Sequence, residues 1–119
     1  MSYKTKERSK LIQYEDFAKV EMRVGKIIKV DDFPKARKPA YQLTIDFGNY
    51  GLKHSSAQIT EVYKKEDLLN RLVVAVTNFP PKQIANFISE VLVLGANNEK
   101  GQVVLLQPDK EVPLGERIY

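Results

Sequence analysis

Residues 41–47 alternate strictly between nonpolar side chains and polar or charged ones. The nonpolar side chains occupy the odd positions: Tyr41, Leu43, Ile45 and Phe47. Because successive side chains on a β-strand point to opposite faces, this period of two predicts a strand with one buried face. Residues 48–51, Gly-Asn-Tyr-Gly, are typical of a tight turn. Residues 52–59 are therefore expected to return as the partner strand of a hairpin.

Four more segments have the β-branched or nonpolar composition of strands: residues 22–30, 71–77, 89–95 and 102–107. The second is expected to be a central strand, and the last two to be joined across a turn. In the first, Met22, Val24, Ile28 and Val30 are expected to share the buried face, which Lys26 interrupts.

Two short helices are also expected, over residues 14–20 and 63–70. The side chains expected to face inward are Tyr14, Phe17 and Ala18 in the first helix, and Leu68 and Leu69 in the second. Asn70 suits the left-handed backbone conformation that commonly ends a helix. The last segment, after residue 107, is expected to be extended and irregular.

The element order is three strands, one short helix and then two or more strands, which is the order of the OB-fold. An SH3-like barrel or a small sandwich would give a similar pattern. The connections over residues 31–40 and 78–86 each contain two prolines, and a proline pair cannot continue a ladder. In an OB-fold they are the loops that contact oligonucleotides or oligosaccharides. We therefore predict an all-β chain with short helices, built as a five-stranded OB-fold barrel.

The chain length of 119 residues is that of one domain. Of the net charge of +4, three charges fall in the first ten residues, where four basic side chains face one acidic one. We therefore expect a flexible basic N-terminal arm over residues 1–12 and one domain over residues 13–119. Such an arm can contact nucleic acid or serve only as a solubilising tail.

Composition argues against catalysis. The chain has no cysteine and one histidine, which excludes thiolate nucleophiles, thiolate metal sites and two-histidine metal sites. His54 has no carboxylate nearby in the sequence to orient it, and the phosphate-binding and hydrolase motifs are absent. We expect no catalytic residue, no metal and no cofactor. The longest apolar runs have the length of strands, so we expect a cytoplasmic protein with no stable membrane insertion.

The two expected loops and the expected strand over residues 52–59 carry or adjoin groups suited to binding. Phosphates could be contacted by Lys35, Arg37, Lys38 and Lys82. Bases or ribose could be contacted by Ser55, Ser56 and Gln58. Stacking platforms could be provided by Phe33, Tyr41, Phe79 and Phe87. Each aromatic ring could instead lie in the core or anchor its loop, and loop cations are often only solvated. Together, these groups favour a binding module over an enzyme.

The run FAKVEMRVGKI resembles the opening of the tRNA-binding domains that occur as free proteins or appended to aminoacyl-tRNA synthetases. With the SSAQIT and NFPPKQIA stretches, the sequence is similar to the CsaA branch of that family, the small export-related chaperones, from about residue 14 to residue 118. Two positions depart from the family pattern. Leu92 stands where tRNA-binding members usually have methionine, and Asn86 stands where CsaA relatives commonly have glycine, with asparagine tolerating a left-handed backbone.

The resemblance implies an OB-fold with terminal extensions that build a homodimer, no catalysis, and binding of unfolded or pre-secretory polypeptide, with tRNA binding in many members. By matched motif it adds Ser89 to the binding candidates. The alternatives are a structure-specific tRNA binder and a synthetase-associated factor. The apolar residues after residue 107 are expected to form the dimer interface, or else to fold back over their own barrel.

Overall fold

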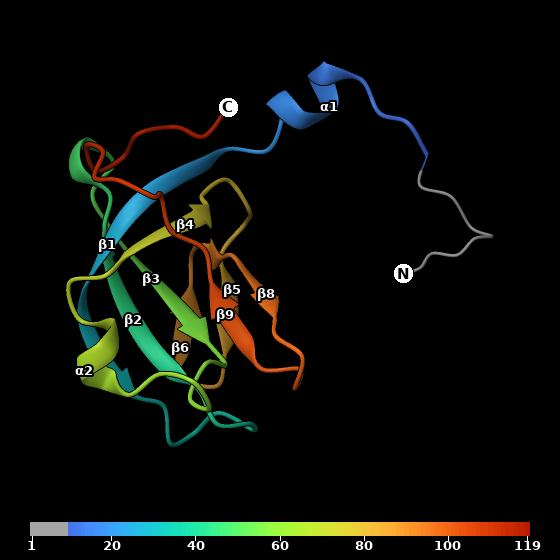
Figure 1. The fold of residues 1–119 in the computed structure, drawn as a ribbon. Helices are drawn as coiled ribbons and strands as arrows, with labels where there is room; N and C mark the ends of the chain where they lie inside the picture. The colour runs from blue at the N-terminus through green and yellow to red at the C-terminus, as the bar shows by residue number, and fades with distance from the viewer. Residues whose placement is uncertain (1–9) are drawn as a thin grey trace.

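The computed structural model describes residues 10–119 and is built mostly of strands (Figure 1). Its helices are α1 (Tyr14–Ala18), α2 (Lys65–Leu68) and the 3-10 turn η1 (Gly48–Tyr50). Its strands are β1 (Met22–Asp32), β2 (Tyr41–Asp46), β3 (Leu52–Ala57), β4 (Leu72–Val76), β5 (Lys82–Ile84), β6 (Phe87–Ser89), β7 (Leu92–Val93), β8 (Gly95–Asn97) and β9 (Val103–Leu105). Residues 1–9 of the expected N-terminal arm lie outside the described residues.

Five antiparallel strands in the order β3-β2-β1-β4-β7 form a nearly closed barrel. The long strand β1 serves both halves of the sheet, because residues 22–26 pair with β4 and residues 26–32 pair with β2. The barrel closes where the backbone N–H groups of Glu90 and Val91 donate to the carbonyl of His54 at 2.8 and 3.4 Å. This arrangement confirms the predicted OB-fold.

The alternating segment forms the central part of the core, as predicted. Leu43, Ile45 and Phe47 are completely buried, and the hairpin partner β3 pairs with β2 along its whole length. The turn between them needs glycine at both ends, because Gly48 and Gly51 have φ values of 64° and 85°. Strand β4 lies between β1 and β7, which confirms the predicted central strand.

The predicted buried face of β1 is confirmed for Val24 and Val30 but is wrong at Ile28. Val24 is 1% exposed and Val30 packs against the core, whereas Ile28 is 38% exposed. A register shift between Ile27 and Lys29 marks a β-bulge, which exchanges the two faces of the strand, so Ile27 faces the barrel interior before the bulge and Val30 faces it after the bulge. Before the bulge, Gly25 faces the interior so closely that an added Cβ would lie 2.5 Å from Cγ2 of Ile45.

The first helix does not have the buried stripe that was predicted. None of its residues is buried, and Tyr14 is 70% exposed. Figure 1 shows the reason, since α1 projects from the barrel near the C-terminus and does not lie against the sheet. Its apolar side chains are thus not packed into the core of the barrel.

The second helix is shorter than predicted and buries one leucine where two were expected. Leu68 is fully buried, but Leu69 already has extended backbone as the C-cap and is 49% exposed. Asn70 has a φ of 70°, which confirms the left-handed stop.

The connection over residues 78–86 contains regular structure that was not predicted. After the proline pair, β5 and β6 form a small hairpin of their own. The left-handed residue in its turn is Ala85, with a φ of 53°, and not Asn86 as the sequence suggested. The predicted strand over residues 89–95 is divided between the end of β6, β7 and the start of β8, and β8 pairs with β9 across the predicted turn.

The C-terminal segment folds back on its own barrel, which was the alternative to a dimer role. The N–H groups of Gly115 and Ile118 donate to the carbonyls of Val24 and Met22 at 2.8 Å each. The segment therefore covers the part of β1 that β2 does not reach. No helix among residues 10–119 is long and apolar enough to cross a membrane.

One member of an ion pair at the end of the barrel, Arg23, also binds this C-terminal segment. Nε of Arg23 donates to the Glu21 carboxylate at 2.7 Å, and Nη1 donates to the carbonyl of Gly115 at 2.8 Å. The guanidinium also lies 3.7 Å from the centre of the Tyr50 ring. The hydrogen bond from Arg23, helped by its charge and by Thr77, lowers the pKa of Glu21 despite the opposing effect of burial.

Candidate binding site

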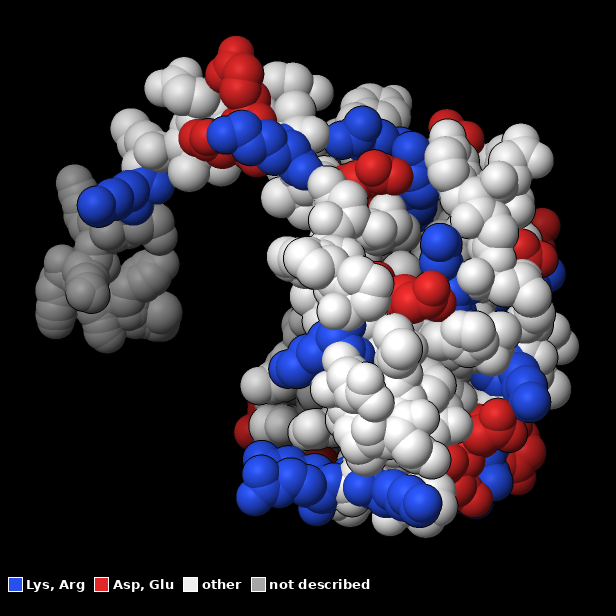
Figure 2. Space-filling model, turned by 180° about the vertical axis from the view of Figure 1, so that it is seen from behind, with Lys and Arg blue, Asp and Glu red and all other residues white. Residues whose placement is uncertain are grey.

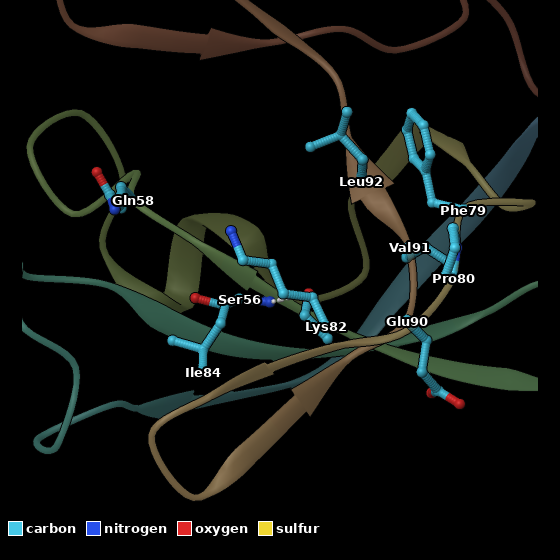
Figure 3. Close-up of a pocket in the computed structure, with 10 residues that line it drawn as sticks. Ser56, Gln58, Phe79, Pro80, Lys82, Ile84, Glu90, Val91 and Leu92 are labelled. Carbon is cyan, nitrogen blue, oxygen red and sulfur yellow. Dashed lines mark hydrogen bonds between the residues drawn. The ribbon is translucent and has the colours of Figure 1, made fainter.

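A hollow with a mainly apolar lining, which we call the apolar hollow, lies beside the β5–β6 hairpin (Figure 3). Its volume is about 540 Å³. It is lined by Ser56, Gln58, Phe79, Pro80, Lys82, Ile84, Ser89, Glu90, Val91 and Leu92. Phe79 and Leu92 project on the same side and are 53% and 51% exposed. Large apolar side chains are therefore presented to solvent inside a concave surface.

A second hollow, which we call the basic hollow, adjoins the first and has a volume of about 940 Å³. It is lined by Lys35, Ala36, Arg37, Lys38, Ala40, Ser56, Gln58, Lys82, Gln83, Ile84 and Ala85. Four of these residues are cations and none is acidic. Figure 2 shows Lys and Arg gathered at the lower end of the molecule, where Figure 1 places the connection between β1 and β2.

Strand periodicity explains why the two hollows share part of their lining. Ser56 and Gln58 are two positions apart at the end of β3, and Lys82 and Ile84 are two positions apart on β5, so each pair points to one side. All four residues line both hollows. In Figure 3, Lys82 extends from β5 toward Gln58. The two hollows are thus neighbouring parts of one surface.

Aromatic packing fixes the hairpin that forms this surface. The Phe87 ring lies 5.4 Å from the Phe33 ring and 6.1 Å from the His54 ring, measured between centroids. The backbone N–H of Ser56 donates to the Ser89 hydroxyl at 3.1 Å, which joins β3 to β6. Phe33 is only 4% exposed, so it anchors the loop and cannot stack on a base. Tyr41 packs against the core and donates its hydroxyl to the carbonyl of Tyr63.

His54 has the carboxylate partner that its sequence neighbours did not reveal. Nδ1 of His54 lies 3.1 Å from Oε1 of Glu90, and the same oxygen accepts the backbone N–H of His54 at 2.9 Å. Figure 3 shows Glu90 pointing out of the apolar hollow. The pair therefore connects β3 to the residues after β6, at the point where the barrel closes.

The structure brings most of the predicted site residues together. Those that line one or both hollows are Lys35, Arg37, Lys38, Ser56, Gln58, Phe79, Lys82 and Ser89. Ser55 is the exception, because it is 1% exposed and its hydroxyl donates to the carbonyl of Ser56. Sequence reasoning missed Ile84 as a lining residue, although its spacing of two from Lys82 was a usable signal. Within the part of the chain that the structure describes, no three His, Asp or Glu residues are grouped to hold a metal.

A family model described as "Putative tRNA binding domain" matches residues 22–117. Two solved structures of CsaA chaperones are similar to this chain. Each match covers 92% of this chain and 100% of the chain in the solved structure. The one from Bacillus anthracis is 51% identical with a TM-score of 0.87, and the one from Picrophilus torridus is 58% identical with a TM-score of 0.85. A methionine–tRNA ligase of Thermococcus onnurineus is 43% identical over 117 residues, which are 97% of this chain and 16% of the ligase.

Proposed function

The chain belongs to the family of tRNA-binding domains and is a CsaA-type member; from this premise we propose that it is a non-enzymatic, homodimeric molecular chaperone for unfolded or pre-secretory polypeptides. We further propose that it acts in the cytoplasm, before export, and that it binds tRNA on the same surface. The division into an arm over residues 1–12 and a binding domain over residues 13–119 is part of this proposal.

The observation that carries the chaperone role is the apolar hollow. A folded protein rarely leaves large apolar side chains exposed in a concave surface unless a ligand covers them. Phe79 and Leu92 are about half exposed there, and the Ser56 hydroxyl and the Gln58 amide lie beside them. Apolar contact with a few polar groups suits an unfolded polypeptide, which presents both apolar side chains and unpaired backbone groups.

The basic hollow favours tRNA as a second ligand. It gathers the cations of two loops, Lys35, Arg37 and Lys38 from one and Lys82 from the other, with no acidic residue in its lining. Such clusters contact phosphates and make binding dependent on salt. A role confined to tRNA, alone or beside a synthetase, is the alternative function, and the methionine–tRNA ligase relatives are the reason for it.

The homodimer is proposed on the apolar residues around α1 and the last residues of the chain. Leu11 is 98% exposed and Tyr119 is 99% exposed, and a hollow of about 180 Å³ between α1 and residues 117–119 has Phe17 and Ile118 in its lining. Unpartnered apolar groups of this kind commonly mark an interface. A two-fold axis would then give one long ligand two copies of the binding surface.

The homodimer is tested by light scattering of the intact protein at micromolar concentration. A dimer is expected, and the variant Tyr14→Ser with Phe17→Ser should shift it toward monomer, since both side chains belong to α1. A monomeric intact protein would refute the homodimer.

The chaperone role is tested by diluting a chemically denatured reporter protein into buffer and following its aggregation by light scattering. The protein should suppress aggregation, and the variant Phe79→Ser with Leu92→Ser should lose most of this effect. The matched control is Leu52→Ser with Leu69→Ser, which changes side chains of similar exposure, 55% and 49%, outside both hollows. Equal suppression of aggregation by the two variants would refute the assignment of the apolar hollow as the binding site. No suppression by the parent protein, combined with tRNA binding, would favour the alternative function.

A further inference from the structure

Strand β5 has one edge without a partner. Among the described strands it pairs only with β6, with Lys82 opposite Ser89, Gln83 opposite Ile88 and Ile84 opposite Phe87. Opposed residues in an antiparallel ladder alternate between pairs that exchange hydrogen bonds and pairs that do not, and the pair next to a two-residue turn exchanges them. The N–H and C=O of Gln83 therefore point away from β6. Outside the β5–β6 ladder, no backbone group of residues 10–119 forms a hydrogen bond with them.

The length of this edge limits what can pair with it. Proline pairs rarely with a neighbouring strand, and Pro81 comes directly before β5. At the other end the chain turns at Ala85, which has a left-handed backbone. The available edge is thus three residues long, too short to promote the edge-to-edge aggregation that longer exposed strands cause. It is nevertheless long enough to hold the backbone of one extended segment.

The free edge lies at the border of both hollows. Lys82 and Ile84 point into them from β5, so a strand added beside β5 would place its own side chains on that side about 5 Å further on. The lining of the apolar hollow presents one charged group, Lys82, because the Glu90 carboxylate points out of it. A lining with so little charge suits an uncharged apolar segment of polypeptide. The polyanionic backbone of RNA is instead matched by the basic hollow.

We propose that the protein binds its polypeptide ligand by β-strand addition to β5. The ligand is an extended segment whose backbone pairs with Gln83 and whose alternate, apolar side chains enter the apolar hollow beside Ile84. This inference rests on the proposed chaperone function and specifies how that function is performed. Because every residue except proline offers the same backbone groups, the site selects extended segments with alternating apolar side chains and tolerates many sequences.

One test changes the protein. Gln83→Pro removes the outward N–H but leaves the β5–β6 ladder intact, since that N–H takes no part in it. Gln83→Ala is the control, because it removes the same side chain and keeps the N–H. The probe is a fluorescent peptide with leucine and serine at alternating positions, measured by anisotropy. Gln83→Pro should weaken binding by about three- to tenfold relative to Gln83→Ala, the effect expected for one lost hydrogen bond. Equal affinities of the two variants would overturn the inference.

A second test leaves the protein unchanged and decides the matter if Gln83→Pro fails to fold. The same peptide is N-methylated at every second amide, in one version on the leucines and in the other version on the serines; these are the two phases. Because all leucines must face the hollow, all N–H groups that face β5 belong to only one of these two residue types, so only one phase removes them. Methylation in one phase should weaken binding at least tenfold, and in the other less than twofold. Equal effects of the two phases would overturn strand addition alone, whereas a parent peptide that does not bind at all would overturn the proposed function as well.

Discussion

Removing two cations from the loop between β1 and β2 should halve the salt dependence of tRNA binding. The basic hollow offers four cations, and each phosphate contact contributes about −0.7 to −0.9 to the slope of log affinity against log salt. Four contacts predict a slope of about −2.8 to −3.6, and raising salt from about 50 to 200 mM should weaken binding about 50- to 150-fold. The variant Arg37→Ala with Lys38→Ala retains two contacts. Its slope should be about −1.4 to −1.8, with a loss of about 7- to 12-fold over the same interval.

The assay is a titration of labelled bulk tRNA at four salt concentrations. The matched control is Lys100→Ala with Lys110→Ala, which removes the same charge from two exposed positions outside both hollows. This control should keep the slope of the parent protein, because long-range attraction by net charge is largely screened at these salt concentrations. If the loop variant and the control reduce the slope equally, tRNA responds to net charge and the assignment of the basic hollow is refuted.

Three further changes test the fold by denaturant unfolding. Gly25→Ala should cost about 1–3 kcal/mol, because the new Cβ would lie 2.5 Å from Cγ2 of Ile45, and a neutral result would contradict this inward position. Glu21→Gln tests the ion pair with Arg23: the pKa of Glu21 is lowered in the folded state, so its stabilisation is present above its ordinary value of 4.5 and is lost as pH falls through the folded value. The parent protein should accordingly lose more stability than the variant as pH falls from about 5 to 3. Equal losses in the free energy of unfolding for the two proteins would show that the ion pair of Glu21 does not stabilise the fold. Ala85→Gly should raise the free energy of unfolding by about 0.5–1 kcal/mol, since Ala85 has a φ of 53°; a loss would show that this backbone is not strained.

Local patterns were sufficient where one short segment determines its own structure. The alternation over residues 41–47 predicted the core strand, because burial of one face is a property of the strand itself. The glycines of the following turn and the left-handed Asn70 were predicted for the same reason, since each reflects the backbone freedom of one residue.

Features that depend on distant contacts were missed. The bulge after Ile27 depends on the pairing of β1 with β2, and no residue type within β1 predicts it. The partner of His54 is Glu90, 36 residues away in the sequence, so neighbouring residues could not reveal it. Phe33 looked available for stacking because it belongs to a loop, but Phe87 of the β5–β6 hairpin covers it.

The cations that line the basic hollow could be predicted because an OB-fold places its loops on one side of the barrel. The apolar part of the lining was harder to predict. Val91 belongs to the core cluster and is 5% exposed, and only the tertiary structure shows that it also borders an open hollow.

Two-dimensional NMR of the ¹⁵N-labelled protein tests whether polypeptide binds on the surface formed by the apolar hollow and β5. The protein is titrated with the alternating leucine–serine peptide, and the backbone amide signals are followed. The largest shifts should fall on Phe79, on residues 82–84 and on Leu92, while the amides of α2 remain unchanged. Shifts centred on α2, or spread evenly over the barrel, would contradict polypeptide binding at this surface.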